Sequence, residues 1–571
     1  MSASNLTPNE SDGRPEQVSA GTVTRGDTTT LFNPFPGLRP FGVEESHLFF
    51  GREGQSDEVL VKLAENRFSA VLGSSGSGKS SLMYCGLIPT LYGGFMTQAG
   101  SNWKIVVLRP GGGPIDNLAE SLVEKDDEYA GLEEEERLIR KTITATVLRS
   151  SSLGLVEAVK QLKKSEDENI LILVDQFEEL FRYKKTESMT SSQDESSAFV
   201  NLLMEAVHQF DEPIYVTITM RSDFIGECAV FPELTQMIND SHYLIPQMTR
   251  DQKRLAIEGP VAVGGGTIAP RLVQQLLNDV GDNPDQLPIL QHSLMRTWSF
   301  WADNHREAEA MDIRHYNAIG TLKEALSQHA NEAYDMLSKR EKQICETMFK
   351  ALTERGSENQ GIRRPTKLSV IASIAGVTED EVYRVVDKFR EPGRSLLMPP
   401  HGKQLESETV IDISHESLMR IWTRLKSWLD EESRSAEMYL KLSESAGRYQ
   451  EGRAGLWKMP DLQLALNWQE ENRPTLVWGQ RYNTAYERTI VFLETSKRAY
   501  ETEQRNKELL QKRQIRRSRI FALVLAGAAL VCIFMMIYAF ILAAEATKQT
   551  VIAEQQAELA QKNADEAQIQ S

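Results

Sequence analysis

The sequence has little cysteine and no pattern of paired cysteines. Its 571 residues include four cysteines, all far apart and none in a Cys-x-x-Cys pair: Cys85, Cys228, Cys345 and Cys532. This spacing argues against a disulfide framework and a cysteine zinc site, and it fits a reducing compartment. The N-terminus also lacks the basic and then apolar pattern of a secretory signal peptide.

Positive charge and N-terminal apolar residues are also scarce. Lys and Arg number 64 against 81 Asp and Glu, which gives a formal net charge of −17. Sequence-independent binding to nucleic acid needs a basic surface, so we expect no nucleic-acid partner, while a local basic face stays open. Residues 1–31 hold few large apolar side chains, and we expect a disordered tail that cannot offset its chain entropy.

The chain is too long for one hydrophobic core, and its pattern changes along its length. Residues 32–233 contain four nearly continuous apolar runs: Phe68–Leu72, Lys104–Leu108, Ile170–Val174 and Ile214–Met220. Such runs are typical of strands buried on both faces of a parallel sheet, and they predict an α/β nucleotide-binding domain. After it we expect a helical domain over 234–338, a winged-helix domain over 339–430 and a charged helical region over 431–519.

One long apolar run departs from a soluble pattern. Residues 520–544, IFALVLAGAALVCIFMMIYAFILAA, contain no charged side chain. A helix of that length spans about 37 Å, enough to cross a hydrocarbon core of ~30 Å. A buried core helix is the alternative, but core helices rarely stay apolar all round for so long. We therefore predict one transmembrane helix.

The flanks of this run predict its orientation. The N-terminal flank is basic: Lys512, Arg513, Arg516, Arg517 and Arg519. The tail over 545–571, which we expect to be a helix or coiled coil, is acidic on balance. The positive-inside rule predicts a single pass through the inner (cytoplasmic) membrane, with the large N-terminal part in the cytoplasm and the short tail outside.

The stretch LGSSGSGKSSL follows the first apolar run and opens a helical segment, which is the context of a phosphate-binding P-loop. Glycines let backbone N–H groups face phosphates, the lysine reaches the β- and γ-phosphates, and the following serine can hold Mg²⁺. The predicted binding residues for ATP or ADP are Gly73, Ser74, Ser75, Gly76, Ser77, Gly78, Lys79, Ser80 and Ser81.

Two further strand ends supply acidic and basic groups. Asp175 ends the run ILILVD, and we expect it to bind Mg²⁺ together with Ser80. Glu178 and Glu179 follow, and either could orient or deprotonate the attacking water, or both could simply favour a helix N-terminus. Arg221 ends the run VTITMR and could contact the γ-phosphate, with a salt bridge to a neighbour as the alternative.

Six segments in this order resemble a known family: NPFPGLRPF…HLFFGRE, the P-loop, LVDQFEELF, TMRSDF, LPILQHSLMRTW and ISHESLMRIWTRLKSWL. Together they resemble the first group of bacterial novel STAND NTPases, which are relatives of the NACHT and NB-ARC signalling ATPases. The resemblance covers about residues 32–519. It implies an AAA+-like P-loop fold followed by helical and winged-helix domains.

The resemblance also implies roles for three residues. Arg52 matches the GRE element that lies near the adenine. Pro288 resembles the proline of the GLPL motif that stacks on the base, although the glycine before it is absent. His415 resembles the MHD histidine that reaches the β-phosphate of bound ADP, with Ser414 and Glu416 replacing Met and Asp.

The remaining question is what the nucleotide does. An ABC transporter ATPase should carry an LSGGQ-type signature and a second acid beside Asp175, but Gln176 follows it. A hexameric motor should carry an arginine finger. Arg363-Arg364 is the one candidate pair, and the sequence does not place it at the phosphate of a neighbouring subunit. The resemblance favours a switch that rests with ADP, self-associates with ATP and resets by slow hydrolysis.

The sequence does not identify the activating signal or the downstream effector. The resemblance implies a role in bacterial defence or stress signalling, with a sensor or effector that could be a separate protein. The alternative from another class is a membrane-tethered scaffold or regulator with a structural nucleotide and a partner-binding winged helix.

Overall fold

The computed structural model describes residues 23–25, 28–30, 32–183, 191–209, 211–281, 286–355 and 361–569. The chain forms two compact units, Met1–Arg434 and Ser435–Ser571. Most of the tail expected to be disordered lies outside the described residues. Its described part contains two short antiparallel strands, β1 (Val23–Arg25) and β2 (Thr28–Thr30).

A five-stranded sheet forms the centre of the first unit, and every neighbouring pair of its strands is parallel. The four predicted runs form four of its strands, which confirms the predicted parallel sheet. In spatial order the strands are β4 (Trp103–Leu108), β5 (Asn169–Val174), β6 (Ile214–Arg221), β3 (Phe68–Gly73) and β7 (His242–Leu244).

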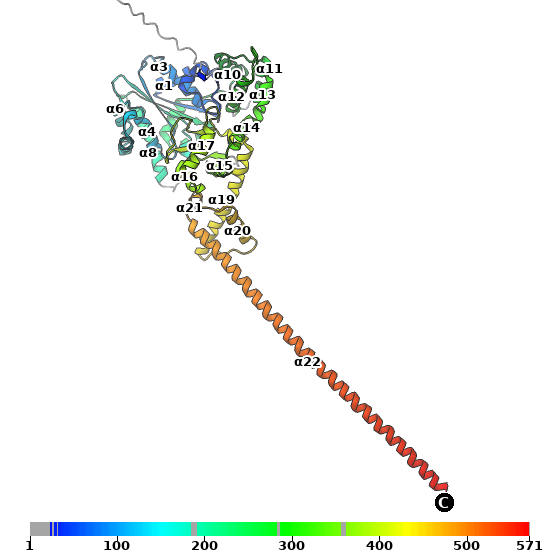
Figure 1. Ribbon diagram of the computed structural model, residues 1–571. Helices are drawn as coiled ribbons and strands as arrows, with labels where there is room; N and C mark the ends of the chain where they lie inside the picture. The colour runs from blue at the N-terminus through cyan, green and yellow to red at the C-terminus, as the bar shows by residue number, and fades with distance from the viewer. Residues whose placement is uncertain are drawn as a thin grey trace, which may run out of the picture. The chain divides into compact units, whose positions relative to one another are not determined.

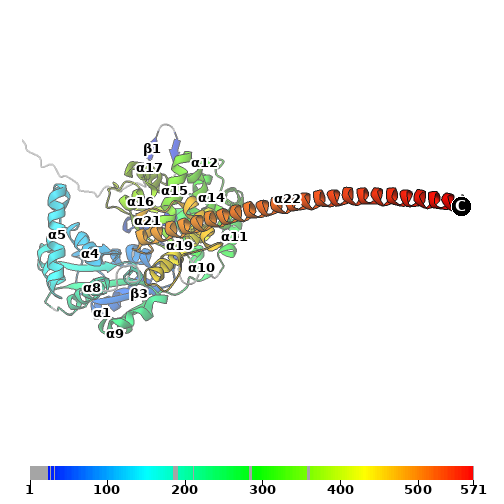
Figure 2. The same ribbon diagram turned by 90° about the horizontal axis from the view of Figure 1, so that it is seen from below.

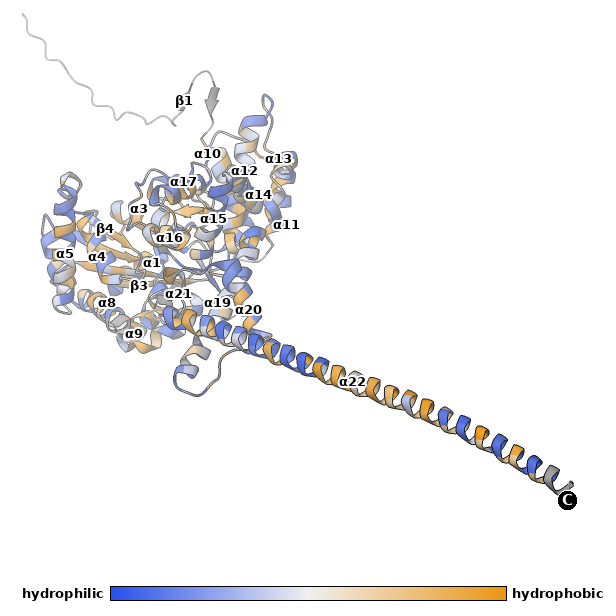
Figure 3. Cartoon of the chain, turned by 60° about the horizontal axis from the view of Figure 1, so that its bottom comes forward, coloured by the Kyte–Doolittle hydropathy of each residue, from blue (hydrophilic) through white to orange (hydrophobic). Residues whose placement is uncertain are grey.

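Both faces of this sheet are buried, as the continuous apolar runs require. In β5, Ile170, Ile172 and Val174 enter one hydrophobic core, while Leu171 and Leu173 enter the core on the opposite face. The strands are mostly hydrophobic in Figure 3. Alternate residues of a strand point to opposite faces, so an uninterrupted apolar run serves both cores.

Helices cover the two faces. The core with Leu171 includes α1 (Gln55–Asn66) and the helical run after the P-loop, which is α2 (Lys79–Leu82), a π-helical turn (Met83–Leu87) and α3 (Ile88–Tyr92). The helices that contribute to the core with Ile170 include α4 (Pro114–Val123), α5 (Glu134–Ser150), α6 (Gly154–Leu162) and α8 (Ser191–His208), of which α4, α5 and α8 lie together in Figure 2.

A helical region follows the sheet and has its own core, centred on Trp298 and Trp301. Its helices are α10 (Arg250–Val263), α11 (Pro270–Val280), α12 (Leu287–Asn304), α13 (Ile313–Ala318) and α14 (Thr321–Asp335). The helix α9 (Pro232–Asp240) precedes β7 in the chain, and its Leu234 and Ile238 belong to the sheet core that contains Ile170.

Residues 339–434 of the first unit, called here the C-terminal module, combine helices with small antiparallel sheets. The helices are α15 (Lys339–Ala351), α16 (Leu368–Ala375), α17 (Glu379–Arg390) and α18 (Ser417–Ile421). Strands β10 (Thr366–Lys367), β12 (Val410–Ile413) and β11 (Leu397–Met398) form one sheet; β8 (Thr353–Arg355) and β9 (Gly361–Arg363) form another. The assignment of this module as a winged helix stays a prediction, as do the domain boundaries.

The second unit holds α20 (Asp461–Asn472), α21 (Leu476–Gln480) and α22 (Tyr486–Ile569), while α19 (Thr423–Gln450) contributes residues to both units. The predicted apolar run lies inside α22, which is drawn as a single helix in Figure 1. Among the described residues this is the one helix long and apolar enough to cross a membrane, judged by length and composition, and its apolar window is fully exposed.

Candidate nucleotide-binding site

The predicted P-loop connects β3 to α2 and wraps around its own lysine. Gly76 and Gly78 have φ values of 72° and 90°, a left-handed region that favours glycine. The Lys79 ammonium donates hydrogen bonds to the carbonyl oxygens of Gly73 at 3.0 Å and Ser74 at 2.8 Å. The loop therefore places a cation at its centre.

The charge of this lysine is balanced by two carboxylates. Lys79 is almost fully buried, and burial lowers the pKa of its ammonium against the opposing effect of Glu178 and Asp175. A phosphate at the loop would add negative charge beside Lys79 and favour its charged form.

The loop's serines differ in their partners. The Ser77 hydroxyl is buried and has no hydrogen-bond partner among the described residues. An unsatisfied buried hydroxyl inside a phosphate-binding loop fits a site that a ligand completes. Ser81, also predicted to bind, instead accepts a hydrogen bond from the Phe41 backbone N–H at 3.2 Å.

The two predicted metal ligands meet at the end of β5. The Ser80 hydroxyl donates to Asp175 Oδ1 at 2.7 Å, and Thr219 of β6 donates to the same oxygen at 2.7 Å. Asp175 is fully buried, and its Oδ2 lies 3.4 Å from the Tyr84 hydroxyl and 3.6 Å from Arg109 Nε. A hydroxyl and a carboxylate beside a phosphate loop fit Mg²⁺, which prefers oxygen ligands and takes one or two carboxylates plus phosphate.

Glu178 and Glu179 are consecutive but have different partners. Glu178 accepts the backbone N–H of Arg221 at 3.3 Å, on the P-loop side of the sheet edge. Glu179 accepts the backbone N–H of Gly111 at 3.1 Å. Burial raises the pKa of the Glu179 carboxyl to about 7, against the attraction of the Arg109 guanidinium.

Arg221 ends β6 at the position paired with Gly73, where β3 enters the P-loop. Its Nη1 donates to both carboxylate oxygens of Glu416 at 3.0 Å. Its Nε and Nη2 donate to Asp223 at 3.1 and 2.7 Å. The salt bridge that the sequence offered as an alternative is thus present, between Arg221 and Asp223. The Nη1 atom of Arg221 points instead to Glu416 of the C-terminal module.

Glu416 is a site residue that the sequence did not predict, as are Tyr84, Arg109 and Thr219 around Asp175. Glu416 follows β12, is 8% exposed, and accepts a hydrogen bond from the P-loop hydroxyl of Ser75 at 3.3 Å. Its neighbour His415 has Nδ1 2.9 Å from the Ser417 hydroxyl and 3.1 Å from the Ser417 backbone N–H. The nucleotide contact of His415 stays a prediction. The sequence feature that could have pointed to Glu416 is its position directly after His415.

Arg363 makes a second link between the C-terminal module and the sheet edge. Its Nη1 donates to Asp412 at 2.6 Å and to the carbonyl of Ile413 at 3.1 Å, and its Nη2 donates to the Gln176 side chain at 2.8 Å. Gln176 directly follows Asp175 and has a φ of 59°. The arginine that the sequence could not place therefore contacts the residue beside the predicted metal ligand, within the same chain.

Arg52 links the P-loop to the segment after β7 and to α1. Its guanidinium donates to the carbonyls of Ser77 at 2.8 Å and Pro246 at 2.7 Å, and to the Gln55 side chain at 3.1 Å. Burial lowers the pKa of Arg52 to about 10. Its role shown here is to hold the loop, and the predicted nearness to adenine stays a prediction.

A narrow cleft of about 20 Å³ lies beside Arg52. Its lining residues come from the P-loop, the segment after β7, α10 and the start of α12: Arg52, Ser74, Ser77, Ile245, Pro246, Gln247, Met248, Lys253 and Leu287. Pro288, predicted to stack on the base, is the next residue of α12 after Leu287. Arg52 thus lines the cleft, whereas the base contact of Pro288 stays a prediction.

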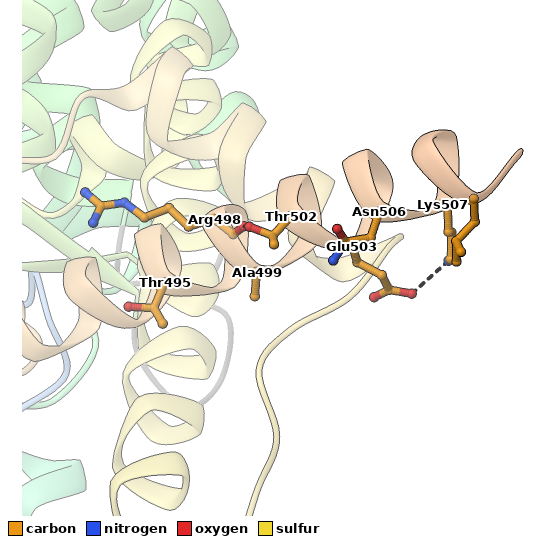
Figure 4. A pocket seen from close by; sticks show the side chains of 8 residues that line it. Thr495, Arg498, Ala499, Thr502, Glu503, Asn506 and Lys507 are labelled. Carbon is orange, nitrogen blue, oxygen red and sulfur yellow. Dashed lines mark hydrogen bonds and ion pairs between the residues drawn. The ribbon is translucent and has the colours of Figure 1, made fainter. Parts of the chain in front are cut away.

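A larger hollow lies elsewhere, along α22 (Figure 4), and we assign no nucleotide to it. It is lined by one helix only: Thr495, Arg498, Ala499, Thr502, Glu503, Asn506, Lys507 and Leu510. Glu503 and Lys507 form an ion pair at 2.7 Å across one turn. A single helix face cannot enclose a ligand.

The sequence profile described as Novel STAND NTPase 1 matches residues 34–455, more than half of the chain. The chain belongs to this STAND NTPase family. It is therefore a nucleotide-binding P-loop NTPase, which confirms the resemblance inferred from the motifs. No curated protein matches the chain.

Several solved structures resemble this STAND NTPase in fold. The Aeropyrum pernix ORC1 protein in complex with DNA has 15% identity over 67% of this chain and 93% of its own, with a TM-score of 0.34. The Aeropyrum pernix ORC2 protein, in ADPNP-ADP complexes, has 12% identity over 66% and 94%, with a TM-score of 0.38. A Walker-type ATPase of Pyrococcus abyssi has 12% identity over 67% and 98%, with a TM-score of 0.32. These scores carry no argument about ligands, so the expected absence of a nucleic-acid partner stays a prediction.

Proposed function

We propose that this STAND NTPase is a membrane-anchored signalling switch that rests with ADP, assembles with ATP, and resets by slow ATP hydrolysis. The observation that supports it is the pair of links, Arg221 to Glu416 and Arg363 to Gln176, between the sheet edge and the C-terminal module. The phosphates of a bound nucleotide would lie at this sheet edge. A diphosphate and a triphosphate would therefore affect the contact between the sheet and the C-terminal module differently.

The proposed chemistry assigns one role to each residue. Lys79 and the loop N–H groups bind the phosphates, and Ser80 with Asp175 holds Mg²⁺, which would neutralise phosphate charge. Glu178 orients the attacking water, because it lies on the P-loop side beside Arg221. Arg221 stabilises charge on the terminal phosphate once its Nη1 is available.

The energy that such a switch requires is modest. Moving a population from mostly closed to mostly open takes about 5.5 kcal/mol of differential binding. Hydrogen bonds to charged groups contribute about 1.5–3 kcal/mol each, so two exchanged links supply most of that amount. The run over 520–544 would anchor the switch in the inner membrane, with the basic flank and the NTPase in the cytoplasm.

The full chain in detergent micelles tests this proposal. We expect bound ADP to survive purification, ATP to convert a monomer to an oligomer measured by analytical ultracentrifugation, and phosphate release to be slow. Lys79→Ala should abolish nucleotide binding and ATP-dependent assembly, whereas Lys367→Ala, at an exposed ion pair of the C-terminal module, should change neither. Assembly that ignores the nucleotide, together with absent turnover, would support a scaffold with a structural nucleotide.

A further inference from the structure

We propose that the Glu416 carboxylate competes with the terminal phosphate of a nucleoside triphosphate for Arg221 and Ser75. On this inference, which rests on the proposed switch, Glu416 makes the closed arrangement selective for a diphosphate. A triphosphate must displace Glu416 from the P-loop before it can bind fully.

Beside a contact with Arg420 Nη2 at 3.5 Å, Glu416 makes two contacts that a phosphate oxygen could make. One oxygen accepts from Ser75 Oγ at 3.3 Å, and both lie 3.0 Å from Arg221 Nη1. Ser75 belongs to the phosphate-binding loop, and Arg221 is paired with Gly73 on the neighbouring strand. An anion held between a loop hydroxyl and a strand-end arginine is the usual arrangement of phosphate recognition.

Arg221 directs Nη1 toward Glu416. Nε and Nη2 each donate a hydrogen bond to Asp223, and Nη1 donates to both oxygens of Glu416, so Nη1 is the nitrogen for which Glu416 and a terminal phosphate would compete. Both competitors are negative, and Glu416 is 8% exposed, so solvent and salt would screen their repulsion poorly. The carboxylate and the phosphate therefore exclude each other at this point.

This competition lowers the apparent affinity for triphosphate without touching that for diphosphate. When a ligand binds only one form of a protein, its apparent dissociation constant equals the intrinsic one divided by the populated fraction of that form. A diphosphate ends before Arg221 and meets no such restriction. Glu416 lies between β12 and α18, which starts at the next residue, so its displacement would act on both elements.

The test is equilibrium binding of ADP and of ATPγS to the full chain in detergent micelles, measured by displacement of a fluorescent ADP. Glu416→Gln should lower the ratio of the ATPγS Kd to the ADP Kd by about tenfold, because a charge-assisted competitor is removed. Glu416→Asp, with a shorter side chain, should lower the same ratio by about threefold while keeping the negative charge. The ADP Kd should change less than about twofold in both variants.

Glu408→Gln provides the matched control. It removes a carboxylate from the same module at an exposed side chain paired with Lys367 at 2.6 Å, and it should leave the ratio unchanged. A ratio within twofold of wild type in both Glu416 variants, at unchanged thermal unfolding midpoints, would overturn the inference. So would an equal effect of Glu408→Gln. If ATP drives assembly of the wild type but the ratio of the ATPγS Kd to the ADP Kd is the same in the variants, the role of Glu416 is wrong and the proposed switch stands. If ATP does not drive assembly, the proposed switch is wrong whatever that ratio is.

Discussion

At the scale of single residues, the function of an acidic side chain depends on which neighbour it faces. Glu178 and Glu179 are adjacent in sequence, yet one contacts the Arg221 backbone and the other contacts that of Gly111. Glu178 lies in the turn before α7 (Glu179–Tyr183), whereas Glu179 is the first residue of that helix. The partner of Glu178 ends the strand next to the P-loop strand, and the partner of Glu179 follows β4, at the other side of the sheet.

This difference predicts unequal effects on hydrolysis. Glu178→Gln should lower kcat for ATP hydrolysis by about 100-fold, the contribution of a positioned general base, with little change in ADP affinity. Glu179→Gln, the same substitution at the adjacent residue, should lower kcat less than about tenfold. Phosphate release at saturating ATP measures both, and a larger loss in the Glu179 variant would reverse the assignment.

At the scale of elements, α12 and α14 meet through a buried pair of histidines. His292 Nε2 lies 2.9 Å from His329 Nδ1, and His292 Nδ1 has no hydrogen-bond partner among the described residues. Burial lowers the pKa of His292 from 6.5 to about 3 and that of His329 well below 6.5, with nearby positive charge acting in the same direction. The folded helix pair therefore keeps both imidazoles neutral.

The sign of this shift predicts acid sensitivity of the helical region. Because the folded pKa values are depressed, the stabilisation is present above pH 6.5 and is lost as pH falls from there toward 3. Each histidine contributes up to about 1.4 kcal/mol per pH unit in that window. The thermal unfolding midpoint should thus fall between pH 7 and pH 5, and it should fall less in His292→Gln.

His401→Gln is the control for this prediction, because its side chain is 45% exposed. We expect its pH dependence to match that of the wild type. Equal slopes in all three proteins would show that the pair does not govern acid sensitivity.

At the scale of the whole molecule, α22 joins regions that the sequence pattern separates. It runs from Tyr486 to Ile569, through the charged region, the apolar run and the tail. Gly527 is its single glycine and it contains no proline, so nothing in the sequence forces it to end earlier. Its exposed apolar surface between 520 and 544 has no protein partner within the described residues, which supports the proposed membrane anchor.

Membrane anchoring can be tested on the full chain by adding charge to the middle of this run. Val531→Lys with Ile533→Lys should move the protein from the carbonate-washed membrane pellet to the supernatant, because each lysine at a helix centre costs about 2.5–3.5 kcal/mol. Ile552→Lys, in the tail of the same helix, should leave the protein in the pellet. A double variant that stays in the pellet would exclude anchoring by this run.

Much of the nucleotide-binding edge could be predicted because its residues are close in sequence to the strands that carry them. The P-loop, Asp175 and Arg221 each follow an apolar run, and parallel strands bring their carboxyl ends to one edge. Arg109 and Thr219 also lie at strand ends, but their pairing with Asp175 depends on the strand order, in which β6 lies between β5 and β3.

The sequence by itself determined the parallel sheet, the P-loop, the family and the apolar run, because each is a local pattern or an ordered set of local patterns. Only the tertiary structure decided that Glu416 reaches Ser75, 341 residues away, and that Arg363 reaches Gln176, 187 residues away. Hydrogen bonds between distant segments have no sequence period, so they form only once packing brings the sheet edge and the C-terminal module together. The contacts that support the proposed switch therefore depend on the tertiary fold, whereas the P-loop beside them can be identified from the sequence alone.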